Sequence, residues 1–409
     1  MAGETLFTID VSSVQAVALA ICTYYFGVWV RKRVYLFERF AVPSPVIGGM
    51  TFAFLLSGLK ANGILTVNFD SSLQTLLMLA FFTTIGLSAG LKVVKQGGGL
   101  LIGFLIAVTV LTVLQNLLGM GVAEWLGLDM HYGILAGSVS MMGGLGTAAA
   151  FGPYFEQTYG IVGGTAVAIT AATFGMVASL IIGAPLGSFL IRKYKVKTPI
   201  ENVSNEDVKI PEEFDTDVID SDHQPTMTAQ LMKATSIVTL SMAAGVAVSS
   251  FLDHFITLPA YIGSMMVAAI VRNVGDFSGK YRVDGKGLNA VADISLVLFV
   301  TMAINSLKLN ELINLAGPLV VILACQTILT VLFLWICVFL VFGRNYDATM
   351  LCVGGIGFSM GATANGLANM QAIAEKYGTS PRAWLIVSIV GAFLIDLINA
   401  LLITWMGAW

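Results

Sequence analysis

Two glycine-rich stretches inside apolar sequence carry the groups best suited to hold a small ion. Residues 137–148 and 354–366 each combine several glycines with serine, threonine or asparagine. Glycine at this density breaks a helix, because it adds backbone entropy and permits positive φ. Free N–H groups at a broken helix end attract an anion, and free carbonyl oxygens attract a cation. The hydroxyl and amide groups on these stretches, of which some are expected to face such a ligand, come from Ser140, Thr147, Thr363, Asn365 and Asn369.

A purely structural alternative remains for these stretches. Glycines also let helices pack closely, and a serine or threonine in a membrane helix often bonds to its own backbone. The symmetric placement of the two stretches, described below, favours the ligand-binding interpretation.

One carboxylate, Asp396, lies in the middle of the apolar segment 382–407. A charge at this depth costs about 2.5–3.5 kcal/mol on insertion scales and needs a partner. No Lys or Arg lies deep in any apolar segment, so both a bound cation and a neutral, hydrogen-bonded acid remain open. Asp293 lies only about one helical turn inside its apolar segment and is expected to contact interfacial water.

The elements that must position these residues are transmembrane helices. Hydrophobic residues make up 57% of the 409 residues and charged residues 11%, against roughly 25% charged residues in a soluble domain. Recurring apolar runs of about 20 residues predict an all-α polytopic membrane protein. Ten spans are expected, at residues 11–30, 43–60, 72–93, 98–126, 160–191, 229–252, 256–272, 288–308, 315–343 and 382–407.

The basic residues orient these spans. With both termini outside, the inner loops collect all of the 21 lysines and arginines except Lys60 and Lys308, as the positive-inside rule requires. This distribution holds only if residues 131–156 and 347–376 do not cross the membrane. They are therefore predicted to be re-entrant hairpins, the first entering from outside and the second from inside.

The two halves of the chain repeat each other. Thr109–Leu114 matches Thr327–Leu332, and the same offset carries Met142 onto Met360. A constant offset through helices and loops indicates an internal duplication. Because five spans per copy is an odd number, we expect two inverted repeats, each with one hairpin, and alternating access.

The repeats define the expected domains. The N-terminal repeat is 1–192, with its hairpin at about 131–156, and the C-terminal repeat is 228–409, with its hairpin at about 347–376. Residues 193–227 are rich in Asp and Glu and lack apolar periodicity. They are predicted to be a solvated cytoplasmic linker.

Inverted repeats with opposed hairpins favour a carrier over a channel. An enzyme is not expected, because no span holds a carboxylate pair or a nucleophile with a base. The histidines His131, His223 and His254 lie at interfaces or in the linker. The four cysteines suit neither a disulfide framework nor a zinc site. No cofactor and no nucleic-acid partner are expected.

Several motifs resemble those of the bacterial sodium/glutamate symporter family, over nearly the whole chain except the linker. They are PSPVIGG at 43–49, LMLAFFTTIGL at 77–87, ATFG at 172–175, GAT at 361–363, ANMQAI at 368–373, and GAF at 391–393 with Asp396 and Asn399.

The resemblance implies Na⁺-driven uptake of L-glutamate across the bacterial cytoplasmic (inner) membrane, with Na⁺ as the coupling ion. It also implies a homodimer and elevator-like movement of a transport domain against a scaffold. Substrate binding is then expected at Ser140, Gly143, Gly144, Gly146, Thr147, Gly361, Ala362, Thr363 and Asn365. Sodium is expected at Thr83, Thr84, Asn369, Asp396 and Asn399.

The hairpin motifs depart from the family pattern. The family's outer loop typically reads Ser-Gly-Gly-His-Gly-Thr, and this chain has Met142 and Leu145 in place of the serine and histidine. Its inner loop typically reads Thr-Pro-Thr after Gly-Ala, and this chain has Thr363, Ala364 and Asn365. The alternative is therefore a proton- or sodium-coupled carrier of another small organic anion or amino acid.

Overall fold

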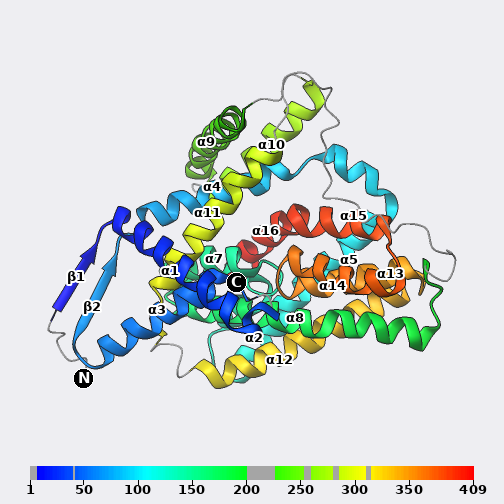
Figure 1. Ribbon diagram of the computed structural model, residues 1–409, viewed down its shortest axis with the longest axis horizontal. Coiled ribbons are helices and arrows are strands. Elements are labelled where there is room, and N and C mark those ends of the chain that lie inside the picture. Colours follow the sequence, from blue (N-terminus) through cyan, green and yellow to red (C-terminus); the bar gives the residue numbers. More distant parts are fainter. Residues whose placement is uncertain (1–6, 40–41, 200–225, 253–258, 280–284, 310–314) are drawn as a thin grey trace.

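The computed structural model describes residues 7–39, 42–199, 226–252, 259–279, 285–309 and 315–409 (Figure 1). Eight helices in these ranges are long and apolar enough to cross a membrane. This confirms the prediction of an α-helical polytopic membrane protein. The predicted linker falls largely on residues 200–225, outside the described residues.

The helices of the first half follow the predicted order. They are α1 (Ser13–Arg33), the short α2 (Tyr35–Arg39), α3 (Ser44–Ala61), α4 (Ser72–Ser88), α5 (Leu91–Trp125) and α8 (Gly164–Tyr194). Between α5 and α8 lies a broken element made of α6 (Met130–Ile134), the π-helix η1 (Leu135–Val139) and α7 (Gly144–Tyr159).

The second half has the same order of elements. Its helices are α9 (Met227–Leu252), α10 (Ala260–Ser278), α11 (Gly285–Asn305), and α12 (Ala316–Phe333) continued by η4 (Leu334–Leu340). A broken pair, α13 (Tyr346–Ser359) and α14 (Thr363–Tyr377), precedes the last helix. That helix consists of α15 (Pro381–Ile389), η5 (Val390–Leu394) and α16 (Ile395–Gly407).

Two predicted spans form shorter or more polar helices than the rest. Helix α4 has 17 residues. Helix α10 has 19 residues and ends in a charged turn, where Arg272 Nε donates to Asp276 Oδ2 at 3.0 Å. Neither is among the eight helices that qualify by length and composition.

The helices pack as two bundles. The first bundle contains α1, α3, α4, α9, α10 and α11, and the second contains α5 to α8 and α12 to α16. Each bundle therefore takes helices from both halves of the chain.

Glycines let the backbones of neighbouring helices approach closely in both bundles. A Cβ on Gly27 of α1 would lie 2.1 Å from the Ser44 carbonyl oxygen, and a Cβ on Gly133 would lie 2.1 Å from the carbonyl carbon of Gly119.

The chain crosses between the bundles from α4 to α5, and α5 is interrupted at this point. Gly98 has φ 62° and ψ −158°, a backbone conformation essentially confined to glycine. The interruption separates residues 91–97 from the long apolar part of α5.

A two-stranded parallel sheet was not predicted from the sequence. Strand β1 (Phe7–Val11) pairs with β2 (Leu65–Phe69), with Phe7 opposite Leu65. The strands flank α1 and α3, so their pairing depends on how those helices pack.

Candidate functional site

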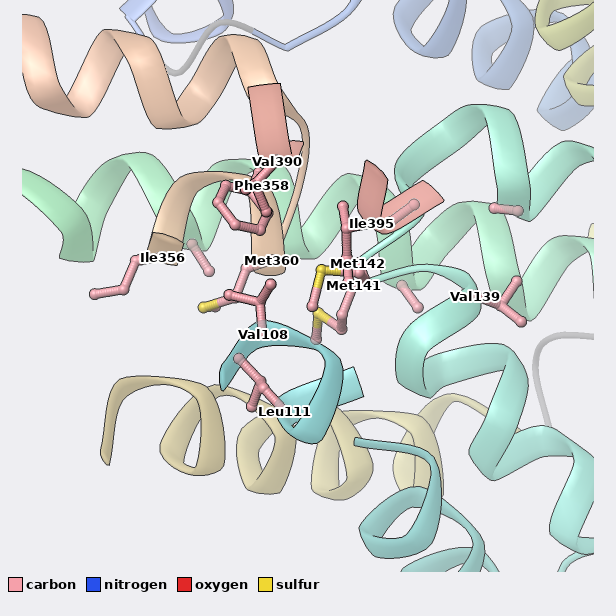
Figure 2. Packing of buried hydrophobic residues seen from close by; sticks show 14 of the residues in the cluster. Val108, Leu111, Val139, Met141, Met142, Ile356, Phe358, Met360, Val390 and Ile395 are labelled. Atoms are coloured by element: carbon pink, nitrogen blue, oxygen red, sulfur yellow. The ribbon is translucent and has the colours of Figure 1, made fainter. Parts of the chain in front are cut away.

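Both glycine-rich stretches fold as broken helices whose tips meet. The first break, residues 140–143, lies between η1 and α7, and the second, residues 360–362, lies between α13 and α14. Gly144 has φ +63°, and a Cβ there would lie 2.4 Å from the Gly361 carbonyl oxygen. Figure 2 shows Met142 and Met360, one from each break, close to each other and near Val108 of α5. Only glycine permits this contact at position 144.

A cavity of about 520 Å³ lies where the tips face the first bundle. This volume suits a small-molecule ligand. One wall comes from the first bundle: Pro43, Pro45, Phe81, Ile85, Asp293, Leu296, Val297 and Val300. The other wall comes from the second bundle: residues 142–147, Met176, Phe358, residues 361–364, Gly391, Ala392 and Asp396.

Two helices begin at this cavity. Helix α7 begins at Gly144 and α14 begins at Thr363, and the first-turn residues of both line the cavity. Their N-cap residues, Gly143 and Ala362, have no side-chain group that could cap the helix. The Gly144 N–H donates to the Ser140 carbonyl, and the Asn365 N–H donates to the Ala362 carbonyl. The other N–H groups of the two first turns present partial positive charge at the cavity, which favours an anion.

Asp396 lies on the same cavity in the first turn of α16, directly after the π-helix η5. Among the described residues, no basic side chain forms an ion pair with it. A carboxylate without a cationic side chain at this depth needs a cation or a proton. The cavity thus combines partial positive charge for an anion with a carboxylate for a cation.

The structure brings most of the predicted substrate residues together. Those that line the cavity are Gly143, Gly144, Gly146, Thr147, Gly361, Ala362 and Thr363. The Thr363 hydroxyl donates to the Gly391 carbonyl at 2.5 Å, which ties α14 to η5.

Ser140 and Asn365 do not line the cavity. The buried Ser140 hydroxyl lies 2.5 Å from the carbonyl oxygen of Leu135 and 2.7 Å from that of Ala168. Asn365 Nδ2 donates to the Met176 carbonyl at 2.9 Å and to Ser179 Oγ at 3.0 Å. Both side chains hold the broken helices against α8.

Of the residues predicted to bind sodium, Asp396 alone lines the cavity. The hydroxyls of Thr83 and Thr84 are buried and donate to Leu79 and Phe81 carbonyls of their own helix, at 2.7 and 2.6 Å. These two residues lie in the first bundle.

The two predicted asparagines tie elements of the second bundle together. Asn369 Nδ2 donates to the Ser179 carbonyl at 3.0 Å, and Asn399 Nδ2 donates to the Ser138 carbonyl at 3.0 Å. Asn399 lies one turn after Asp396. Its Oδ1 and the nearby Ser138 Oγ are buried, and no described donor bonds to either oxygen. These oxygens are available to a cation.

The first broken helix, α6 to α7, is anchored at its start by Asp129 and His131. The Asp129 carboxylate caps α6 by accepting from His131 N at 2.9 Å, and His131 Nε2 lies 3.0 Å from the Gly407 carbonyl of α16. Burial alone would raise the pKa of Asp129, but the hydrogen bonds from His131, with the positive charge of its ring when protonated, hold that pKa below the usual value. The hairpin and the Asp396 helix are thereby joined at one end.

A second cavity, of about 390 Å³, lies near this end of the molecule. It also runs between the bundles, from the start of α4 and α10 to the ends of α7 and α11. Its lining includes Lys308, Glu156, Tyr154 and Tyr261.

Sequence reasoning missed the wall contributed by the first bundle. Asp293, expected only at the membrane interface, lines the cavity of about 520 Å³, on the wall opposite to that of Asp396. Asp293, Leu296, Val297 and Val300 have the spacing of one helical face. The sequence does contain one signal, a carboxylate on an otherwise apolar helix face. Only the packing of the helices shows that this face lines a cavity.

Comparison with known proteins agrees with these features. The sequence profile described as Sodium/glutamate symporter matches residues 9–379. The sodium/glutamate symporter of Escherichia coli (strain K12) is 38% identical over 367 residues, covering 90% of each chain. That of Haemophilus influenzae is 35% identical over 399 residues, covering 96% of each chain. Symporters are membrane carriers, so the activity is transport and not enzymatic catalysis. The chain belongs to the sodium/glutamate symporter family.

Proposed function

We propose that this multi-pass membrane protein couples inward Na⁺ movement to uptake of L-glutamate. One observation carries the proposal: two helix N-termini without side-chain caps and the carboxylate of Asp396 line a single cavity. An anion and a cation bound there would neutralise each other, so each raises the affinity for the other. Such reciprocal coupling is what symport requires.

The carboxylate groups of glutamate would bind to backbone N–H groups at the two breaks. The first turns of α7 and α14, with the hydroxyls of Thr147 and Thr363, supply these donors. Within the described residues, the lining of this cavity includes no Lys or Arg. Backbone dipoles therefore take the place of a basic side chain.

Sodium would bind beside Asp396. The unpartnered oxygens Asn399 Oδ1 and Ser138 Oγ belong to the same region, and Na⁺ favours such oxygen ligands at broken membrane helices. This supports the roles predicted for Asp396 and Asn399, and it adds Ser138. Thr83, Thr84 and Asn369 remain predicted sodium ligands, and none of the three lines the cavity that contains Asp396.

The two-bundle arrangement supports alternating access by an elevator-like movement. The second bundle contains both breaks and Asp396, so it would carry the ligands, and the first bundle would be the scaffold. The two cavities lie between the bundles, where a sliding movement would open one and close the other. Inverted repeats, a homodimer, and an inner-membrane location with both termini outside complete this proposal.

A different organic anion is the second candidate substrate. Met142 and Leu145 occupy the positions where the family typically has serine and histidine, and both line the cavity. Their apolar side chains cannot donate to a ligand, so a cargo less polar than glutamate would fit this part of the wall.

Uptake into proteoliposomes tests both candidates. We expect a Na⁺ gradient, but not a choline gradient, to drive saturable uptake of radiolabelled L-glutamate. Competition by L-aspartate, L-glutamine, 2-oxoglutarate and less polar carboxylates gives the substrate class. If glutamate neither enters nor competes while another carboxylate does, the second candidate replaces the first.

A further inference from the structure

A second group of buried oxygens lies away from Asp396, between α5, α12 and the end of α13. Gln115 of α5, Gln326 of α12 and Ser359 of α13 are completely buried. Gln115 Oε1, Gln326 Oε1 and Ser359 Oγ have no hydrogen-bond partner among the described residues. Buried polar atoms without partners are rare in folded proteins, because their desolvation is not compensated.

Hydrogen bonds from the two glutamine amides to main-chain carbonyls place Gln115, Gln326 and Ser359 next to one another, as one cluster of residues. Gln115 Nε2 donates to the Ser359 carbonyl at 2.9 Å and to Thr330 Oγ1 at 3.1 Å. Gln326 Nε2 donates to the Gln115 carbonyl at 2.6 Å.

These bonds also fix the orientation of both amides. A backbone carbonyl can only accept, so each amide must turn its NH₂ group toward the carbonyl it contacts. Rotating either amide to give its oxygen a donor would break that bond. The two Oε1 atoms therefore remain acceptors in need of a positive partner.

The position of Ser359 favours a cation over a neutral partner. Ser359 is the last residue of α13, a helix of 14 residues, and the carbonyl end of a helix carries partial negative charge. The cluster contains no carboxylate, so a monovalent ion suits it better than a divalent one. A water molecule is the competing occupant.

We propose that Gln115 Oε1, Gln326 Oε1 and Ser359 Oγ bind a second sodium ion, distinct from the one at Asp396. This inference rests on the proposed Na⁺-coupled function and deepens it. Ser359 directly precedes the break at 360–362, whose Gly361 and Ala362 line the substrate cavity. Figure 2 shows Met360, the residue after Ser359, close to Met142 at the tip of the other hairpin. Sodium bound at this cluster would hold the inner tip in position to receive the anion.

Direct binding of ²²Na⁺ to the purified full-length protein tests the proposal. The wild type should bind two ions per chain, and Ser359→Ala should weaken one of them by about tenfold or more. Gln326→Leu should do the same through a different ligand. Thr112→Val is the matched control, because Thr112 is equally buried on α5 but its hydroxyl donates to the Val108 carbonyl of its own helix.

Sodium binding by the wild type and the variants distinguishes failure of this inference from failure of the proposed function. Wild-type affinity and two ions per chain in both Ser359→Ala and Gln326→Leu would mean that the cluster holds water, which overturns this inference and leaves symport intact. Absence of Na⁺ binding by the wild type would overturn the proposed function together with it. The melting temperature in choline identifies any variant that fails to fold, and Ser359→Ala should keep or raise it, since it removes an unpartnered hydroxyl.

Discussion

In the proposed mechanism, ion coupling depends most directly on Asp396. It lines the cavity, and none of the described basic residues pairs with it. Asp396→Asn keeps the shape of the side chain and removes its charge. We expect the Na⁺ concentration for half-maximal uptake to rise about tenfold or more, with the protein still folded in the membrane. A proton site would instead make the same substitution abolish the pH dependence of uptake.

Gly144 is the residue at which the two tips touch. Gly144→Ala introduces a Cβ 2.4 Å from the Gly361 carbonyl oxygen and places alanine at positive φ, which alone costs about 1–2 kcal/mol. Gly160→Ala has the same strain, at φ +70°, but its Cβ meets no atom within 4 Å. Glutamate binding, measured by isothermal titration, should be lost in Gly144→Ala and kept in Gly160→Ala. Equal binding by the two variants would mean that contact between the tips is not needed.

At the scale of elements, the proposed movement would bend the chain at Gly98, where α5 is interrupted between the two bundles. Gly98 combines positive φ with ψ −158°, and a Cβ there would meet nothing within 4 Å. Gly98→Ala should therefore act only through the backbone and slow transport by disfavouring this bend. Gly99→Ala, also without close neighbours and without positive φ, is the control. If uptake rates fall equally in both variants, the backbone conformation of Gly98 has no special role in transport.

The sequence predicted the elements far better than the directions of their side chains. All ten expected spans contain a helix, and both broken helices lie where glycine accumulates, because apolar length and helix breaking are local properties. The pairing of β1 with β2 depends on tertiary packing and gave no sequence signal. Ser140 and Asn365 lie on the predicted breaks, yet bond to α8, since the direction of a side chain at a break depends on its neighbours.

At the scale of the whole molecule, the proposal requires one bundle to move against the other. Phe151 of α7 and Tyr261 of α10 belong to different bundles, with ring centroids 5.3 Å apart. Phe82 of α4 and Tyr261 both belong to the first bundle, at 4.8 Å. Cysteine pairs at these two sites, in a background without native cysteines, can be linked with a short bifunctional thiol reagent.

Linking positions 151 and 261 should arrest uptake until the link is cleaved. Linking positions 82 and 261 should leave transport active, because both helices stay within the first bundle. Full transport with the bundles linked would exclude their relative movement. The same membranes, treated with an amine-reactive linker, test the predicted homodimer by the size of the product.

Charge movement tests the account as a whole. Two Na⁺ ions with one glutamate carry one net positive charge inward, which gains about 2.3 kcal/mol per 100 mV of inside-negative potential. The measurement is the initial rate of Na⁺-driven L-glutamate uptake into proteoliposomes, with the potential clamped at zero or inside-negative by K⁺ and valinomycin. We predict faster uptake at the inside-negative potential. A rate independent of potential would contradict two-ion coupling, and uptake without Na⁺ would contradict sodium symport itself.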